Sequence, residues 1–216
     1  MIAEGRVALH GEKIATPATL LTDVAGVTVD GRPVRPAKAT RLYRFYKPQR
    51  TLTAEFDSKK RPTIYDVLPA GLPRLMPVGR LDFMTEGLLL LTNDGELKRQ
   101  LELPKTGVVR TYRARAFGHV TQEQLESLAE GITIDGVRYG SINANLERST
   151  GHNRWIEMNL TEGKNREVRR VLEHLGLQVS RLIRTAYGPL NLAGLEPGGI
   201  DEVDPGQLDQ FRKTLK

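Results

Sequence analysis

The chain has 216 residues, of which 39% are hydrophobic and 27% are charged. This length suits one medium domain or a small domain followed by a larger one, and the composition is that of a protein with a packed core. The absence of cysteine excludes disulfides, iron–sulfur clusters and thiolate zinc sites. Since no apolar stretch of about 18 residues and no signal-peptide pattern is found, we expect a cytoplasmic protein without a membrane segment.

The formal net charge is +6, and basic residues are concentrated in two parts of the chain. Seven lie between residues 41 and 61, and six lie between residues 164 and 184. Two separate basic clusters on a folded chain are typical of contact with a phosphate backbone. The alternative is a pair of solvated surfaces without a ligand.

Residues 1–38 are expected to form a unit of their own. Short strands are predicted at 5–11 and 24–31, the second ending in an Asp-Gly turn, and Pro33, Pro36 and Ala37 suggest a linker. These residues resemble the second half of an S4-like RNA-binding module. The helix pair that opens such a module is missing, so either the start codon is placed too late or the module is truncated. The alternative is a two-strand flap on the main domain.

The remaining residues, 39–216, are expected to form the main domain. Strands are predicted at 41–47, with a basic face, and at 88–92, 108–117 and 155–160, and helices at 63–68, 96–101, after 121 and at 166–175. Thr121 and Gln124 form a capping box before a helix that carries Leu125, Leu128 and Ala129. Strands and helices do not alternate regularly. We therefore expect an α+β fold with a mixed, largely antiparallel sheet and flanking helices.

Several common catalytic motifs are absent from the sequence. It has no Gly-rich phosphate loop, no dinucleotide-binding fingerprint and no Gly-x-Ser-x-Gly elbow. The four histidines are far apart and never at metal-ligand spacing. No metal site is indicated.

The most informative segment is 79–95, in which Asp82 stands between an arginine and a glycine-punctuated turn, ahead of four consecutive leucines. A carboxylate at the edge of a buried strand can take part directly in chemistry. In a chain with two basic clusters, this suggests a carboxylate that acts on a polyanion. The alternative is an aspartate that merely caps a turn.

Four blocks in this order resemble the RsuA-type family of ribosomal RNA pseudouridine synthases: 79–95, 110–113, 162–170 and 181–184. The resemblance covers about residues 39 to 200 and implies a catalytic domain of pseudouridine synthase type behind the partial S4-like module. It also implies the isomerisation of specific uridines in ribosomal RNA. The N1–C1′ bond breaks, the uracil turns, and C5 joins C1′, so no cofactor is needed.

The resemblance also implies roles for single residues. Asp82 would be the catalytic carboxylate, and Arg169, on the polar face of its helix, would keep it ionised and oriented. Tyr112 would stack against a flipped uracil. The substrate-binding residues would be Arg80, Thr85, Arg110, Lys164, Arg166, Leu182 and Arg184. Leu182 would close the apolar side, Arg110 would keep the charge of a lysine that the family often has there, and Arg80, Lys164, Arg166 and Arg184 would grip phosphates or hold the loop. Without the resemblance, an exposed helix arginine, a core tyrosine and a buried leucine would be ordinary readings.

The expected partner is ribosomal RNA, and the expected state is a monomer. In segments 59–62, 103–107 and 151–153 the chain resembles the branch of the family that modifies large-subunit RNA more than the small-subunit branch. The sequence does not identify the uridine. Two other functions remain open on the residues alone: a non-catalytic RNA-binding or ribosome-assembly protein, and a metal-dependent nuclease that uses Asp82 with Asp94 and Glu96.

Overall fold

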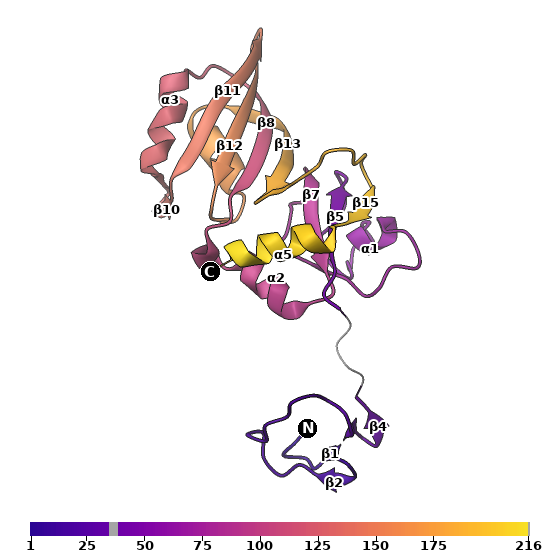
Figure 1. The fold of residues 1–216 in the computed structure, drawn as a ribbon. Coiled ribbons are helices and arrows are strands. Elements are labelled where there is room, and N and C mark those ends of the chain that lie inside the picture. Colours follow the sequence, from indigo (N-terminus) through magenta and orange to yellow (C-terminus); the bar gives the residue numbers. More distant parts are fainter. Residues whose placement is uncertain (35–38, 216) are drawn as a thin grey trace. The chain divides into compact units, whose positions relative to one another are not determined.

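The computed structural model describes residues 1–34 and 39–215. The chain divides into two compact units, Met1–Ala39 and Thr40–Lys216 (Figure 1). Of the expected linker, Pro36 and Ala37 lie outside the described residues, whereas Pro33 belongs to a strand. None of the described helices is long and apolar enough to cross a membrane.

The first unit is a small antiparallel sheet of strand order β2-β1-β3-β4. The strands are β1 (Val7–Leu9), β2 (Glu12–Lys13), β3 (Val27–Val29) and β4 (Arg32–Pro33). Val7, Ile14 and Val27 form its core. The two predicted strands are therefore present, and each pairs with a two-residue partner. That this unit is a partial S4-like module stays a prediction.

The second unit is built on one mixed sheet of order β11-β12-β8-β13-β7-β5-β15 (Figure 1). β14 also pairs with β13, and β6 pairs with β7. The bounds are β5 (Leu42–Lys47), β6 (Met76–Pro77), β7 (Thr85–Thr92), β8 (Arg110–Phe117), β11 (Ile142–Thr150), β12 (Asn153–Leu160), β13 (Gln178–Tyr187), β14 (Leu190–Asn191) and β15 (Ile200–Glu202). β13 and β7 run parallel, while the other named pairs in the described residues are antiparallel. The predicted α+β class is confirmed.

Helices and a small hairpin flank this sheet. They are α1 (Ile64–Val67), α2 (Gly95–Glu102), α3 (Gln122–Glu126), α4 (Glu167–His174) and α5 (Pro205–Thr214), the 3₁₀ helices η1 (Pro104–Thr106) and η2 (Ser127–Glu130), and the hairpin of β9 (Ile132–Ile134) with β10 (Val137–Tyr139). The capping box of Thr121 and Gln124 is confirmed at the start of α3. Ala129 is exposed and not part of the core, because the chain tightens into η2 and rotates this residue outward.

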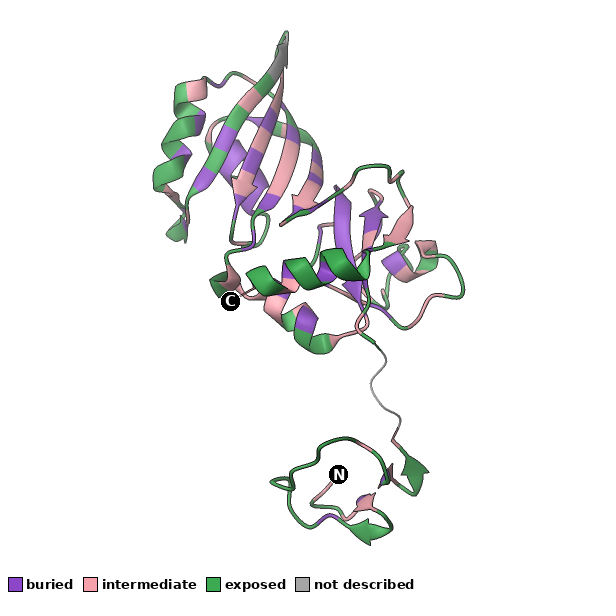
Figure 2. Cartoon of the chain, viewed as in Figure 1, coloured by how far each residue is buried: buried purple, intermediate pink, exposed green. Residues whose placement is uncertain are grey.

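The four-leucine run forms the centre of β7, which is buried along its whole length (Figure 2). Successive side chains of a strand point to opposite faces, so the leucines feed two different cores. Leu88 and Leu90 pack in the cluster that contains residues of α2 and α5, whereas Leu89 and Leu91 pack in the cluster that contains Ile64 of α1. Because β7 is covered on both faces, its sequence is continuously apolar.

Gly87 explains how β7 can pair with β13. Its φ is +105°, and a Cβ added there would lie 2.3 Å from the carbonyl oxygen of Arg184. Only glycine allows two backbones to approach this closely with such a φ. This parallel pair joins the two halves of the sheet, and it brings the residues just before β7 next to β8 and β13.

Candidate active site

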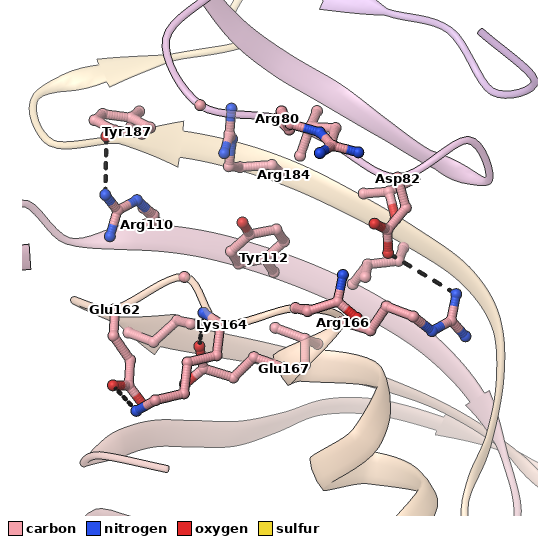
Figure 3. Close-up of a pocket in the computed structure, with 18 of the residues that line it drawn as sticks. Arg80, Asp82, Arg110, Tyr112, Glu162, Lys164, Arg166, Glu167, Arg184 and Tyr187 are labelled. Atoms are coloured by element: carbon pink, nitrogen blue, oxygen red, sulfur yellow. Dashed lines mark hydrogen bonds and ion pairs between the residues drawn. The ribbon is translucent and has the colours of Figure 1, made fainter. Parts of the chain in front are cut away.

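The four sequence blocks meet in one cleft of about 730 Å³ (Figure 3). It is lined by parts of segments 79–85, 110–112, 160–168 and 182–187, together with Glu102 and Pro104. Glu102 of α2 accepts a hydrogen bond from the backbone N of Gly79 at 2.7 Å, which fixes the start of the first segment. Residues far apart in the sequence thus form a pocket of the size that holds a small molecule or an extruded base.

Asp82 and Tyr112 share this cleft, as predicted (Figure 3). Asp82 lies three residues before β7, and its side chain is 36% exposed. The nearest cation is Arg166, whose Nη1 is 3.9 Å from Oδ2 of Asp82. Tyr112 reaches the cleft half-buried from the middle of β8. A carboxylate accessible to solvent and an aromatic ring therefore face the same space.

Arg169 is placed differently from the prediction. It does not lie on an exposed polar face but is buried in α4, and it is not among the residues that line the cleft. Its guanidinium donates to the carbonyl oxygens of Met84 and Val179, both at 3.3 Å. Burial and the neighbouring charge of Arg166 lower the pKa of Arg169, while the negative charge of Asp82 raises it. Arg169 thus holds the backbone beside Asp82 and acts on that carboxylate through its charge.

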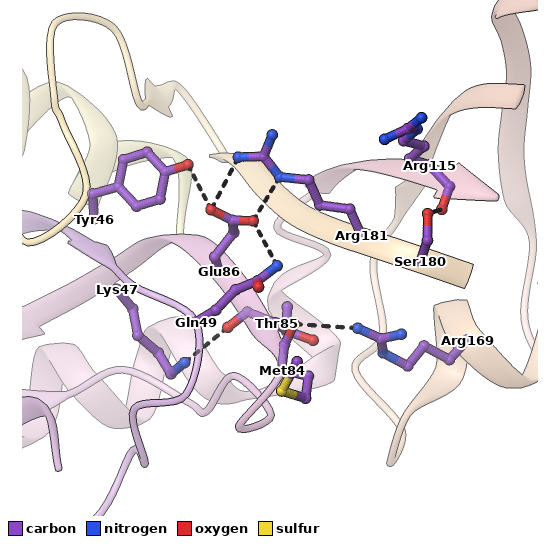
Figure 4. A network of polar contacts seen from close by, with 10 residues as sticks. All are labelled: Tyr46, Lys47, Gln49, Met84, Thr85, Glu86, Arg115, Arg169, Ser180 and Arg181. Carbon is purple, nitrogen blue, oxygen red and sulfur yellow. Dashed lines mark hydrogen bonds and ion pairs between the residues drawn. The ribbon is translucent and has the colours of Figure 1, made fainter. Parts of the chain in front are cut away.

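The turn that carries Asp82, residues 82–85, is held by three donors to consecutive carbonyl groups, and Figure 4 shows those from Lys47 and Arg169. The backbone N of Arg50 donates to the Phe83 oxygen at 2.7 Å, Arg169 donates to Met84, and Nζ of Lys47 donates to the Thr85 oxygen at 2.8 Å. These donors come from two segments far from the turn in the sequence, the end of β5 with the residues after it and helix α4. The turn is therefore fixed by tertiary contacts and not by its own sequence alone.

Lys47, which donates to this turn, was not predicted from the sequence as part of the site. The predicted basic face of strand 41–47 would have exposed it, but its side chain is completely buried. Burial lowers the pKa of Lys47 to about 8, although the charges of Asp82 and Glu86 partly oppose this shift. A buried ammonium needs acceptors, and it finds them in the carbonyl oxygens of Pro48 and Thr85.

Glu86, next to Thr85 but on the opposite face of β7, clamps three segments together (Figure 4). Its carboxylate accepts hydrogen bonds from the Tyr46 hydroxyl at 3.0 Å, from Gln49 at 2.9 Å and from Nε of Arg181 at 2.7 Å. Burial raises its pKa, but the bonds from Arg181 and Tyr46 bring the net value below the usual range. The contacts of Glu86 could not be predicted from the sequence, because no local pattern joins residues so far apart in the chain.

The opposite wall of the cleft is the loop before α4, which carries Lys164 and Arg166. Glu167 accepts from the backbone N of Lys164 at 2.8 Å, and Glu162 accepts from the backbone N of Gly140 at 2.6 Å and pairs with the Lys164 ammonium. Burial, and then the adjacent Glu162, raise the pKa of Glu167 to about 7. Two carboxyl groups therefore hold the loop that presents its basic side chains at the cleft.

Two of the predicted substrate-binding residues, Arg110 and Arg184, are buried. Arg110 donates to the Thr161 oxygen at 2.6 Å and to the Tyr187 hydroxyl at 3.0 Å, and Arg184 donates to the Leu88 oxygen at 2.7 Å. Both guanidinium groups lie close to the Tyr187 ring. These buried donors connect backbone segments at the base of the cleft, and the Nη2 atom of Arg184 has no hydrogen-bond partner among the described residues.

The other predicted binding residues are divided between the mouth and the base of the cleft. Arg80, Lys164 and Arg166 are exposed, whereas Thr85 and Leu182 are buried. The Thr85 hydroxyl makes no hydrogen bond within the described part of the chain. All five residues line the cleft, so cations surround its opening and an apolar surface lies beneath.

The model of a family described as RNA pseudouridylate synthase matches residues 41–174. An uncharacterized RNA pseudouridine synthase of Rickettsia prowazekii is 40% identical over 210 residues, which are 97% of this chain and 88% of the relative. The chain belongs to the RNA pseudouridine synthase family.

Two further similarities agree with that assignment. Ribosomal large subunit pseudouridine synthase B of Salmonella typhimurium is 39% identical over 224 residues, covering 100% of this chain and 77% of the relative. The crystal structure of a pseudouridylate synthase has a TM-score of 0.70 at 24% identity and covers 96% of this chain and 89% of that one. At 24% identity, the similarity to this crystal structure shows the fold alone.

Membership in this family makes the chain an enzyme that isomerises uridine in RNA, and not a non-catalytic binding protein. The nuclease alternative also lacks support in the geometry. Asp94 caps α2 by accepting from the backbone N of Glu96 and Leu97, and it accepts from the Thr40 hydroxyl at 2.6 Å. Among the described residues, no group of three or more His, Cys, Asp or Glu side chains could hold a metal ion.

Proposed function

We propose that this pseudouridine synthase modifies uridine in large-subunit ribosomal RNA, with Asp82 as the reacting carboxylate. The observation that carries the proposal is the cleft that Asp82 and Tyr112 share below a basic opening. The large-subunit substrate is supported by relatives with that printed name, at 39% and 40% identity over the whole of this chain. The enzyme would act in the cytoplasm as a monomer.

In the proposed reaction, the uridine leaves its stack and enters the cleft. Tyr112 supplies an aromatic surface in place of the lost neighbours. The Asp82 carboxylate then attacks C1′ or accepts a proton from the sugar, and the N1–C1′ bond breaks. After the uracil turns, C5 joins C1′ as the bond from Asp82 to C1′ breaks or as Asp82 returns the proton to the sugar. The C5 proton then leaves and N1 gains a proton. Product and substrate have the same atoms, so the reaction consumes no second reactant.

The exposed cations at the opening would offset the cost of extruding the base. This cost is on the order of a few kcal/mol and is smallest at loops and bulges. Arg80, Lys164 and Arg166 could each contact a phosphate beside the target. Such contacts orient the RNA but do not select a sequence. Selection of the uridine would then depend on the shape of the RNA around it.

The proposal is tested by mapping pseudouridines with a carbodiimide reagent in ribosomal RNA from cells with and without the gene. We expect one or a few large-subunit positions to lose their signal in the deletion strain. The purified protein should restore the same positions in an unmodified large-subunit transcript. If every ribosomal pseudouridine persists in the deletion strain, the proposed substrate is wrong.

A further inference from the structure

The loop between β5 and α1, residues 50–61, displays a phenylalanine to solvent. We call it the basic loop. The Phe56 side chain is 81% exposed, compared with 52% for Phe117, the other exposed phenylalanine of the described residues. A single exposed apolar side chain needs no explanation by itself. What Phe56 can do therefore depends on the loop that presents it.

The basic loop is closed on itself. The carboxylate of Asp57 accepts from the backbone N of Lys59 at 3.1 Å and of Arg61 at 3.0 Å, and from the Arg61 guanidinium at 2.8 Å. These bonds, the one to the Arg61 side chain foremost, hold the pKa of Asp57 well below its usual range. At the neck, the backbone N of Leu52 donates to the Pro62 oxygen at 2.9 Å. The tip of the loop is thus presented in a fixed shape.

The base of the same loop is bonded to both neighbours of Asp82. The Thr53 hydroxyl accepts from the backbone N of Leu81 at 3.3 Å and donates to the Leu81 oxygen at 3.1 Å. The backbone N of Arg50 donates to the Phe83 oxygen at 2.7 Å. Any RNA held by the basic loop would consequently lie next to the reacting carboxylate.

The charges of the loop favour a polyanion. The side chains of Arg50, Lys59 and Lys60 are exposed and make no hydrogen bond or ion pair with any residue that the structure describes. The two acids are neutralised, since Asp57 binds Arg61 and Glu55 lies 3.8 Å from Arg74. An exposed aromatic ring on a loop that also carries unpaired cations offers the two contacts that bind unpaired nucleotides, stacking on the base and charge near the phosphates.

We propose that the basic loop is a second RNA-binding site, in which Phe56 stacks on an unpaired base beside the target uridine and Lys59 and Lys60 contact the flanking phosphates. This inference rests on the proposed RNA substrate and adds a site outside the cleft. The loop would hold the neighbouring nucleotide while the uridine is extruded. The cleft and the loop would then bind the two sides of one distorted strand.

The test measures the affinity of the full-length protein for a large-subunit transcript that contains the mapped uridine. Phe56→Ala is expected to weaken binding about tenfold, and Phe56→Trp is expected to restore it, because a base can stack on either ring. Replacing Lys59 and Lys60 by glutamine should reduce the slope of log affinity against log salt by between about one and two. Thermal unfolding of each variant verifies that the loop substitutions leave the fold intact.

Phe117→Ala is the matched control, because it also removes an exposed phenylalanine but lies at the far end of β8. It should bind the transcript as the wild type does. Equal affinity of Phe56→Ala and wild type would overturn the inference, and so would an equal loss in both alanine variants. A wild-type protein that forms no pseudouridine in this transcript would instead refute the proposed substrate, so the two failures are distinguishable.

Discussion

The two walls of the cleft are built by opposite means. On the wall of Asp82, backbone carbonyls accept hydrogen bonds from donors, among them the charged side chains of Lys47 and Arg169. On the wall of Lys164, backbone N–H groups donate to the carboxyl groups of Glu162 and Glu167. Charged donors thus hold the turn of residues 82–85, and acids hold the loop before α4.

The two walls differ in how their charges respond to pH. A guanidinium stays charged at every physiological pH, and the pKa of Lys47 lies at about 8, so the Asp82 turn keeps its donors at neutral pH. Glu167, with a pKa near 7, changes its charge in that range. Asp82, the proposed reacting carboxylate, therefore lies on the wall whose charges stay constant near neutral pH, while Lys164 and Arg166 lie on the wall that contains the titrating Glu167.

The largest effect, on the rate of pseudouridine formation, is expected from Asp82→Asn. It removes the carboxylate that we propose to react with the substrate while preserving the size of the side chain. We expect pseudouridine formation to fall by at least about 1000-fold, since loss of a reacting group costs this much or more in other enzymes. RNA affinity should remain near that of the wild type. A variant that forms pseudouridine at the normal rate would refute the role given to Asp82.

The next effect is expected from Arg169→Met. The Met84 carbonyl loses a donor, and Asp82 loses a neighbouring positive charge, so the turn is less well placed. A misplaced reacting group lowers rates by about 100-fold, and we expect that loss in kcat. Arg170→Met serves as the control, because Arg170 is the exposed neighbour on the same helix. If both variants have the same kcat, Arg169 does not position the turn.

Lys47→Met is expected to lower the free energy of unfolding. The carbonyls of Pro48 and Thr85 lose their shared donor in a buried place. Leaving buried polar groups unpaired costs about 1–3 kcal/mol. Urea unfolding should report this loss, while Lys213→Met, an exposed change in α5, should leave the free energy of unfolding unaltered. An unchanged midpoint for Lys47→Met would show that water replaces the ammonium without cost.

The smallest effect is expected from Glu167→Gln in α4. It is a change in the free energy of unfolding that depends on pH. Because folding raises the pKa of Glu167 from 4.5 to about 7, the native state binds more protons than the unfolded state between these values. Wild-type stability should hence fall as pH rises from about 4.5 to 7, whereas the glutamine variant should lack this component. At pH 8 the variant should be more stable by about 1–2 kcal/mol.

The control for this pH series is Glu123→Gln, an exposed change in α3. It should follow the wild-type curve throughout. Parallel curves for Glu167→Gln and wild type would mean that Glu167 is ionised in the folded protein across the range. In that case the loop before α4 would not be held by a protonated carboxyl group.

The sequence predicted the elements whose patterns are local. The alternation in 155–160 and the spacing of Val168, Val171 and Leu172 correspond to the inward residues of β12 and α4. The motif blocks predicted which segments line the cleft. Hydrophobic periodicity depends only on near neighbours, so such features are visible without a structure.

The polar contacts that hold the cleft could not be predicted in this way. Lys47, Glu86 and Glu167 are charged residues whose burial depends on partners in other segments. Taken alone, each would be expected on the surface, as charged residues usually are. The same holds for Arg110 and Arg184, whose commitment to carbonyl groups is decided by the pairing of β7, β8 and β13.

The parallel pairing of β7 with β13 has a consequence for how the enzyme is made. Arg184 reaches the carbonyl of Leu88 across 96 positions of the chain. Contacts between such distant residues form late and slow the folding of a domain. During translation, Asp82 would leave the ribosome long before the strand that completes its surroundings. A nascent chain would thus stay inactive until nearly all of it had been synthesised.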